Sequence, residues 1–179
     1  MSNYYYLVAS LPTVEFGMSP PCSTKEFLQR CQGQLSSSDL ATIEKILLSD
    51  EGHAHLDNHI LKHWAEFNHN FRNEMAYVRA VERGKDPSLY LRGSRASDSF
   101  YAAVVTEASQ SPDPLTCEKV FDQNRWQYLD ELSRFHYFDM EWMIVYALKL
   151  KILERYEAIA SPQGQAIFNE YKNIEIAFH

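Results

Sequence analysis

The amino-acid sequence predicts an all-α fold, a compact bundle of six or seven helices of which two are long. Three observations lead to this class. Apolar residues recur at helical spacing over most of the 179 residues. A capping-box pattern, Ser23 with Glu26 three positions later, precedes the first of these periodic stretches. Short breaks rich in Gly, Pro and Ser separate the stretches, which favours antiparallel neighbours.

The first half of the chain opens with a short aromatic and apolar stretch, residues 4–11, whose residue types favour one strand. The stretches that follow have the 3.6-residue period, and each ends near a glycine. The longest of them is marked by a sustained apolar stripe from Ile60 to Val78. The helices expected in this half span residues 24–32, 39–48 and 54–83.

The second half contains the most apolar run of the sequence, from Phe138 to Tyr156, which we interpret as the central helix of the fold. Lys149 is the exception, because it falls in the middle of the apolar stripe. Ser161 and Pro162 match an N-cap followed by proline at the first helical position. The helices expected in this half span residues 98–108, 117–134, 138–156 and 162–174.

The length suggests a single all-helical domain over residues 1–179, large enough to bury a real core. The two longest predicted helices each carry an apolar stripe that ends in Arg or Lys. Two sub-halves, residues 1–93 and 94–179, are therefore an alternative division.

The composition excludes several classes of protein. A net charge of −7 disfavours nucleic-acid binding and peripheral anchoring on anionic lipid. Three cysteines, with no C-x-x-C pair, disfavour a disulfide framework or a zinc knuckle, so a reducing compartment is the default. The opening residues do not form a signal peptide, and no run is apolar enough to span a membrane. We expect a cytoplasmic protein.

A cluster of histidines is the most apparent candidate for chemistry, because five of the seven lie between His53 and His69. Three of them are spaced four residues apart, and a Glu-x-x-His pair resembles the ligand pair of di-iron bundles. No second Glu-x-x-His exists in the chain. A solvated helix face is therefore the preferred interpretation, and a helical metal-binding enzyme the alternative. The candidate ligands are His55, His59, His63, Glu66 and His69.

No other catalytic or cofactor-binding pattern is present. The sequence lacks a G-x-S-x-G elbow and both Gly-rich phosphate-binding motifs. Cys22, Cys31 and Cys117 have no local histidine and are expected to act as small apolar filler. We therefore assign no catalytic residue and no cofactor.

Long helices and abundant aromatic residues suggest a protein that holds partners. Tryptophan, tyrosine and arginine are enriched at interfaces, so three aromatic residues are candidates for partner binding: Trp64, Trp126 and Tyr156. The alternative for each is an ordinary place in the core. A generic helical interaction module with another partner is a further hypothesis.

Lys149 has two interpretations. Its aliphatic stem could pack among aromatic neighbours while the ammonium group reaches the surface. Alternatively, it forms a partly buried ion pair with a carboxylate of a facing helix, for which Asp98 and Asp130 are the candidates. In both cases its role is to fix how helices pack.

Four stretches together resemble a bacterial family of uncharacterised proteins encoded beside V-type (A/V-type) ATP synthase subunits. The stretch from Arg125 to Ile159, RWQYLDELSRFHYFDMEWMIVYALKLKILERYEAI, is the most specific. That family is in turn similar to a shortened form of the V-type ATPase component named C, or d in eukaryotes, which we call the socket component. The other three stretches run from Tyr4 to Pro12, from Trp64 to Pro87 and from Ser97 to Phe100.

The similarity to the socket component depends on the paired tyrosines Tyr4 and Tyr6 and on an Asp-led helix, Asp139 to Lys149, continued by a second basic residue, Lys151. The socket component is all-helical and non-catalytic, and it lies between the rotor stalk and the membrane ring. The resemblance therefore implies a coupling or assembly role, with the subunits of the stalk and ring as partners and a location that is cytoplasmic or peripheral on the inner membrane. This chain is about half as long as a full socket component, and lysine replaces the arginine expected in the helix motif.

Overall fold

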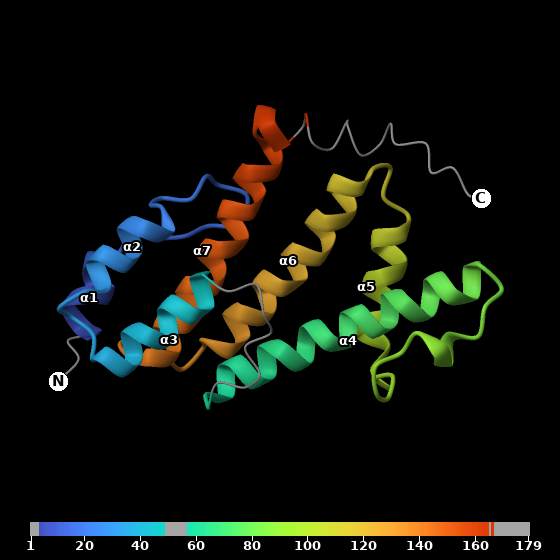
Figure 1. The fold of residues 1–179 in the computed structure, drawn as a ribbon, viewed down its shortest axis with the longest axis horizontal. Helices are drawn as coiled ribbons and strands as arrows, with labels where there is room; N and C mark the ends of the chain where they lie inside the picture. The colour runs from blue at the N-terminus through green and yellow to red at the C-terminus, as the bar shows by residue number, and fades with distance from the viewer. Residues whose placement is uncertain (1–3, 49–56, 165, 167–179) are drawn as a thin grey trace. The chain divides into compact units, whose positions relative to one another are not determined.

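The computed structural model describes residues 4–48, 57–164 and 166. Helices make up the regular structure of the described residues, as the sequence predicts, and no strand occurs among them (Figure 1). The chain divides into two compact units: Met1–Leu48 together with Phe138–His179, and Ser49–Tyr137. We call them the α7 unit and the α4 unit. This division is discontinuous in the sequence, because the helix that follows Phe138 packs on a helix of the N-terminal segment.

Four α-helices lie in the described part of the α7 unit. They are α1 (Tyr4–Ser10), α2 (Thr24–Cys31), α3 (Ser37–Leu48) and α7 (Met140–Ala160). The predicted capping box is confirmed: the Ser23 side chain accepts from the Glu26 amide, and the Glu26 carboxylate accepts from the Ser23 amide at 2.8 Å. Asp139 caps α7 by accepting from the amide of Trp142 at 2.9 Å.

The predicted strand over residues 4–11 is wrong, because Tyr4–Ser10 forms the helix α1. A lone strand has no neighbour to satisfy its backbone N–H and C=O groups, whereas a helix satisfies its own. Tertiary contacts hold α1 in place. Leu7 is buried, and the Tyr4 hydroxyl donates to Asp39 of α3 at 2.8 Å.

The centre of the α7 unit is α7 itself, in agreement with the sequence. All residues from 143 to 150 are buried, including Lys149, which is 9% exposed. Phe27 of α2 and Tyr146 of α7 place their ring centroids 5.1 Å apart. Helix α3 packs directly on α7.

Polar side chains of α7 attach three other segments to it. The Tyr146 hydroxyl donates to the carbonyl of Pro12 at 2.9 Å, and Lys151 Nζ donates to the carbonyl of Ile46 in α3 at 3.3 Å. Glu154 accepts from the backbone amide of Thr24, at 2.6 Å, and from its hydroxyl. Thr24 begins α2, so Glu154 supplies a carboxylate to the N-terminus of that helix.

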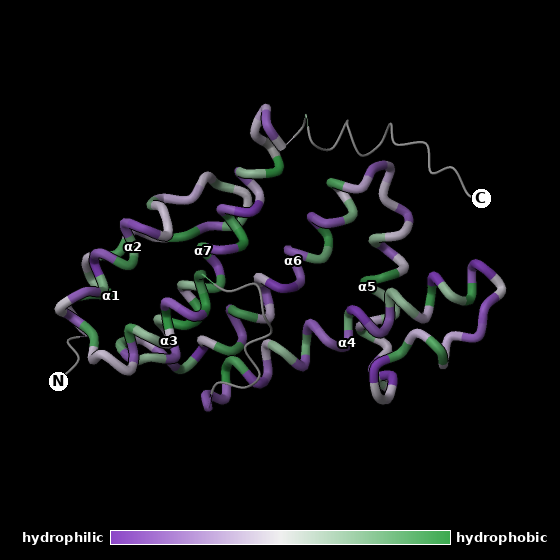
Figure 2. The backbone as a smooth tube through the Cα atoms, viewed as in Figure 1, coloured by the Kyte–Doolittle hydropathy of each residue, from purple (hydrophilic) through white to green (hydrophobic). Residues whose placement is uncertain are grey.

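The α4 unit contains three α-helices and one 3₁₀ turn among its described residues. Asn58, Asp98 and Asp113 cap its α-helices through their side-chain oxygens. Figure 2 shows hydrophilic and hydrophobic positions alternating along α4, as the sequence stripe predicts. The elements are α4 (His59–Glu82), η2 (Pro87–Leu89), α5 (Ser99–Ser109) and α6 (Pro114–Leu132).

Aromatic rings dominate the core of the α4 unit. Phe67 stacks on Tyr128 of α6 with ring centroids 3.9 Å apart, and it meets Phe71 edge-on at 4.8 Å. Phe71 also contacts Phe121 at 5.6 Å. The apolar stripe of the long helix therefore faces α5 and α6. Three small apolar residues of α5 complete this cluster: Val104, Val105 and Ala108.

Buried polar groups of α4 hold the loop that follows η2. Asn73 is 3% exposed; its amide nitrogen donates to the carbonyl of Arg92 at 2.9 Å, and its oxygen accepts from the Arg92 amide at 3.0 Å. Glu74, also buried, accepts two hydrogen bonds of 2.6 Å from the Arg95 guanidinium. That guanidinium lies 3.8 Å from the centre of the Tyr77 ring. The loop is thus fixed at two neighbouring positions.

A second buried carboxylate joins α6 to α4. Asp122 is 1% exposed and accepts from Arg125 one turn later at 2.8 Å. Arg125 also donates to the side-chain oxygen of Asn68 on α4 at 2.9 Å. The same arginine lies near Glu118, at 3.9 Å.

None of the described helices combines the length and apolar character needed to cross a bilayer. Helix α7 ends at Ala160, later than the expected Tyr156, and Ser161 caps it. Residues 162–164 are helical again, and most of the helix expected to reach residue 174 lies outside the described residues.

Candidate partner-binding surface

Three exposed aromatic residues of the α7 unit form a continuous patch: Tyr5, Tyr6 and Phe138. We call it the aromatic patch. Tyr5 meets Phe138 with ring centroids 5.0 Å apart, and it meets Tyr6 edge-on at 5.6 Å. The exposed fractions are 59%, 67% and 49% for Tyr5, Tyr6 and Phe138, respectively. The patch thus presents large apolar surface to solvent.

Local structure explains why these rings face outward. Leu7 and the hydroxyl of Tyr4 attach α1 to the unit, which leaves the Tyr5 and Tyr6 side chains on the other side of the helix. Phe138 directly precedes the Asp139 cap of α7, so its position follows the start of that helix. The patch is thus carried by α1 and by the residue that precedes the N-cap of α7.

The chemistry of the patch favours protein binding over catalysis. Aromatic side chains give large contact area at low conformational-entropy cost, and tyrosine hydroxyls can hydrogen-bond at a wet rim. Residues Tyr5 and Tyr6 lie in the first stretch that carries the family resemblance, and Phe138 lies in the last. Sequence reasoning singled out neither Tyr5 nor Phe138 as an anchor, because the strand expected over residues 4–11 gives no reason to bring them together.

The aromatic residues proposed from the sequence lie deeper. Trp126 is 7% exposed and lies among the core residues of the structure, and its role as a partner anchor stays a prediction. Trp64 is half-buried, packs against the core of the α4 unit and stacks on Phe67 at 6.4 Å. Tyr156 is half-buried and meets Phe16 edge-on at 6.1 Å. The alternative of an ordinary place in the core fits all three better.

The histidine cluster is only partly within the described residues, since His53 and His55 lie outside them. His59 begins α4 and lies obliquely to His136, with ring centroids 5.7 Å apart. His69 Nε2 lies 3.1 Å from the amide nitrogen of Asn73, so it belongs to the loop-holding network. No three of the described candidates, His59, His63, Glu66 and His69, bring ligand atoms close enough to share one ion.

The proposed ion pair of Lys149 stays a prediction. Lys149 belongs to the α7 unit, and both candidate carboxylates, Asp98 and Asp130, belong to the α4 unit. Asp98 is exposed and accepts from the amide of Phe100 at 2.9 Å, as the cap of α5. Lys149 itself is buried, at 9% exposed.

The thiols behave as apolar filler. Cys31 is completely buried, and burial raises its pKa to about 12. Cys22 is also buried, which raises its pKa above the ordinary value, and the pKa of Cys117 is raised for the same reason. A raised pKa favours the neutral thiol, which is a poorer nucleophile than the thiolate.

Comparison with known proteins gives one match. A family model described as "Protein of unknown function (DUF2764)" matches residues 97–174. This region includes α5, α6 and α7, and therefore takes in parts of both compact units. No match was found among curated proteins or among solved structures.

Proposed function

We propose that this protein is a non-catalytic structural or coupling subunit, or an assembly factor, of a bacterial V-type ATPase. In this role it binds the central stalk, the membrane ring or both, from the cytoplasmic face of the inner membrane. Whether that ATPase moves protons or sodium ions does not affect the proposal.

One observation carries the proposal. The two sequence features that resemble the socket component, the paired tyrosines Tyr4 and Tyr6 and the Asp-led helix, are 135 residues apart in the chain, from Tyr4 to Asp139, and belong to one compact unit. Asp139 caps α7, and the hydroxyl of Tyr4 attaches α1 to α3, which packs on α7. If the resemblance were due to chance, we would not expect the two resembling segments to belong to the same compact unit.

The all-helical structure and the aromatic patch also support this function. A socket or adaptor needs a rigid helical body and an exposed apolar contact surface, and the α7 unit has both. Three aromatic rings in contact are a suitable centre for an interface, since such anchors dominate binding energy in protein complexes.

A pull-down experiment tests the proposal. The full-length protein with an affinity tag is expressed in the source cell, and recovered proteins are identified by mass spectrometry. We expect stalk or ring proteins of the ATPase in the eluate. Substituting Tyr5→Ser and Tyr6→Ser together is expected to reduce their recovery at least about tenfold, the ratio that corresponds to roughly 1.4 kcal/mol of lost binding energy.

A matched control separates partner binding from general surface effects. Leu89 lies in the α4 unit and is 76% exposed, so Leu89→Ser removes a similar exposed apolar side chain elsewhere. This control should leave recovery unchanged, and circular dichroism should show native helicity for every variant. If the wild-type protein recovers no ATPase protein from cells that contain the assembled ATPase, the proposal fails.

A further inference from the structure

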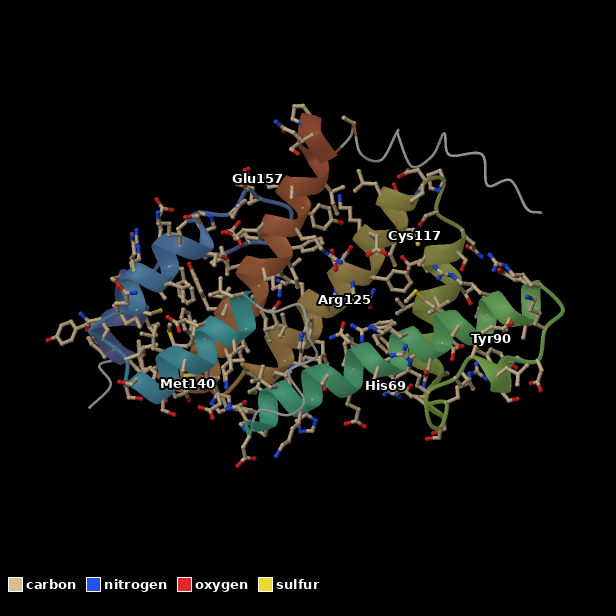
Figure 3. All side chains as sticks on the ribbon, viewed as in Figure 1. His69, Tyr90, Cys117, Arg125, Met140 and Glu157 are labelled. Atoms are coloured by element: carbon tan, nitrogen blue, oxygen red, sulfur yellow. The ribbon has the colours of Figure 1, made fainter. Side chains whose placement is uncertain are left out.

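A hollow of about 270 Å³ lies at the C-terminal end of α4, within the α4 unit. Two alanines on one face of the helix leave room for it, and basic side chains stand around it. Tyr90 follows η2, and Figure 3 labels it beside the C-terminal half of α4. The lining residues are Ala76, Arg79, Ala80, Arg83, Lys85 and Tyr90.

The charge of this hollow is opposite to that of the chain. Three cations, Arg79, Arg83 and Lys85, line it, and no carboxylate does among the described residues. Residues 72–95 contain six Lys or Arg and three Asp or Glu, in a protein whose net charge is −7. Within the part of the chain that the structure describes, none of the three cations has an ion-pair partner. The three cations therefore give this hollow a positive lining.

Two of the nearby carboxylates, Glu74 and Asp86, have hydrogen-bond partners outside the hollow. Glu74 is bound to Arg95 by two hydrogen bonds. Asp86 caps η2 by accepting from the amide of Ser88 at 2.9 Å, and this hydrogen bond lowers the pKa of its carboxyl group. Glu82 lines a second hollow, on the side of α4 that faces α5 and α6, which Arg79 also lines.

The backbone around the hollow is fixed before any ligand arrives. The amide of Lys85 donates to the carbonyl of Ala80 at 2.9 Å, and Gly84 has a φ of +63°, a helix ending that places Lys85 beside the last turn. The 3₁₀ turn η2 then brings Tyr90 back toward α4. Asn73 holds the next residues through both backbone groups of Arg92. A pre-formed site loses little entropy on binding.

We propose that this hollow binds the phosphate group of a small soluble anion, such as a phosphorylated metabolite or pyrophosphate. Two guanidinium groups and one ammonium group are donors that match phosphate oxygens, and the tyrosine hydroxyl can add one more hydrogen bond. The negative end of the helix dipole, equivalent to roughly half a charge, opposes an anion but is outweighed by three full cations. The volume is below the usual range for drug-sized ligands, so a phosphate group fits better than a nucleotide.

Isothermal titration with sodium pyrophosphate at low ionic strength tests this site on the full-length protein. We expect saturable binding, and a Kd at least about tenfold larger for the double variant Arg79→Gln and Arg83→Gln, because both charge-assisted hydrogen-bond donors are removed. Arg134→Gln is the matched control, since it removes an exposed arginine from the same unit outside the hollow. This control should bind like the wild-type protein.

The outcomes that overturn the proposal are distinct. Absence of saturable heat with the wild-type protein at millimolar pyrophosphate overturns it, and so does equal binding by the double variant. If Arg134→Gln raises the Kd for pyrophosphate as much as the double variant does, the change comes from the overall charge of the protein. That result also overturns the proposal. The variants keep the native fold if their melting temperatures match the wild-type value, which we expect because all three arginines are exposed.

Sedimentation with phosphatidylcholine vesicles that contain phosphatidic acid tests the source of the phosphate. We expect no binding to these vesicles that depends on the two arginines of the hollow. Vesicle binding that is lost in the double variant Arg79→Gln and Arg83→Gln would assign the site to a lipid headgroup and overturn the soluble ligand.

Discussion

The α7 unit and the α4 unit differ in the polar groups that they bury. The α4 unit buries Asn73, Glu74 and Asp122, and each of them has a hydrogen-bond partner within the unit. Among the described residues of the α7 unit the one buried charged residue is Lys149, and the core is a continuous set of apolar side chains on α7. The α4 unit therefore uses buried polar groups to fix a loop and a helix pair. The helices of the α7 unit are held together mainly by the packing of apolar side chains.

This difference shows what each kind of interaction specifies. Apolar packing is non-directional and sets how much free energy is gained by burial. A buried bidentate pair such as Glu74 with Arg95 is directional, and it is costly when one partner is lost. The α4 unit needs such directional interactions because the chain between η2 and α5 has no regular secondary structure to fix its conformation.

Core truncation should give the largest effect, and it should be similar in the two units. Leu150→Ala in α7 is expected to lower the free energy of unfolding by roughly 2–5 kcal/mol, and Phe71→Ala in α4 by roughly 3–5 kcal/mol, because each leaves a cavity at a fully buried site. Urea unfolding followed by circular dichroism measures both values. Leu89→Ala, at an exposed position, should change stability by less than about 0.5 kcal/mol. A loss below that threshold for Leu150→Ala would contradict the central role of α7.

Loss of one partner of the buried Glu74–Arg95 pair in the α4 unit should cost somewhat less. Arg95→Met is expected to destabilise the protein by roughly 3 kcal/mol, the low end of the range for a broken buried pair, since the Arg95 side chain is 38% exposed. The double variant Glu74→Met and Arg95→Met should be more stable than Arg95→Met alone, because no buried charge is then left without its partner. Chemical denaturation of the three proteins measures these differences, and equal stability of the single and double variants would show that the pair is not coupled.

Removal of the Glu154 carboxylate tests the polar attachments of the α7 unit. Glu154→Ala is expected to cost roughly 1–2 kcal/mol, because the first amide of α2 loses its acceptor. Glu157→Ala is the control on the same helix, where the side chain is exposed (Figure 3), and it should be nearly neutral. Thermal unfolding of the two variants side by side distinguishes them, and an effect of Glu157→Ala as large as that of Glu154→Ala would contradict a specific attachment.

The smallest effect at neutral pH concerns Tyr146. Burial raises the pKa of its hydroxyl above the ordinary value of 10.0. The neutral form is favoured in the folded state, so this contribution to stability is fully present below pH 10 and is lost as the pH rises above it. The free energy of unfolding should therefore fall in that range, and Tyr146→Phe should flatten the fall while costing about 1 kcal/mol at neutral pH through the lost hydrogen bond to Pro12. Identical alkaline slopes for the two proteins would refute this explanation.

The helical period was sufficient to predict most of the fold. Each predicted helix from residue 24 to residue 156 has a counterpart, because the apolar stripes of α4 and α7 extend over several turns. The exception is residues 4–10, where local propensity favours a strand and tertiary contacts decide for a helix. Short segments contain too little periodic signal to reveal such contacts.

The candidate sites were harder to predict, because their residues are far apart in the sequence. Tyr5 and Phe138 are in contact across most of the chain, and Glu154 accepts from Thr24, which is 130 positions earlier. Glu154 and Lys151 both attach neighbouring segments to α7, and neither contact follows from the helical period. The basic residues around the hollow are visible as a local surplus of charge, but only the turn after α4 shows that their side chains surround one site.

The discontinuous α7 unit has a consequence for biosynthesis. The α4 unit is one continuous segment and can fold as soon as residue 137 has left the ribosome, whereas α1, α2 and α3 must wait for α7, more than 90 residues after α3 ends. During that interval the apolar faces of these three helices remain without their partner, and long-range contacts of this kind form slowly. Nascent chains halted before residue 138 should therefore be the ones that recruit chaperones, and release of the chaperones should coincide with synthesis of the central helix.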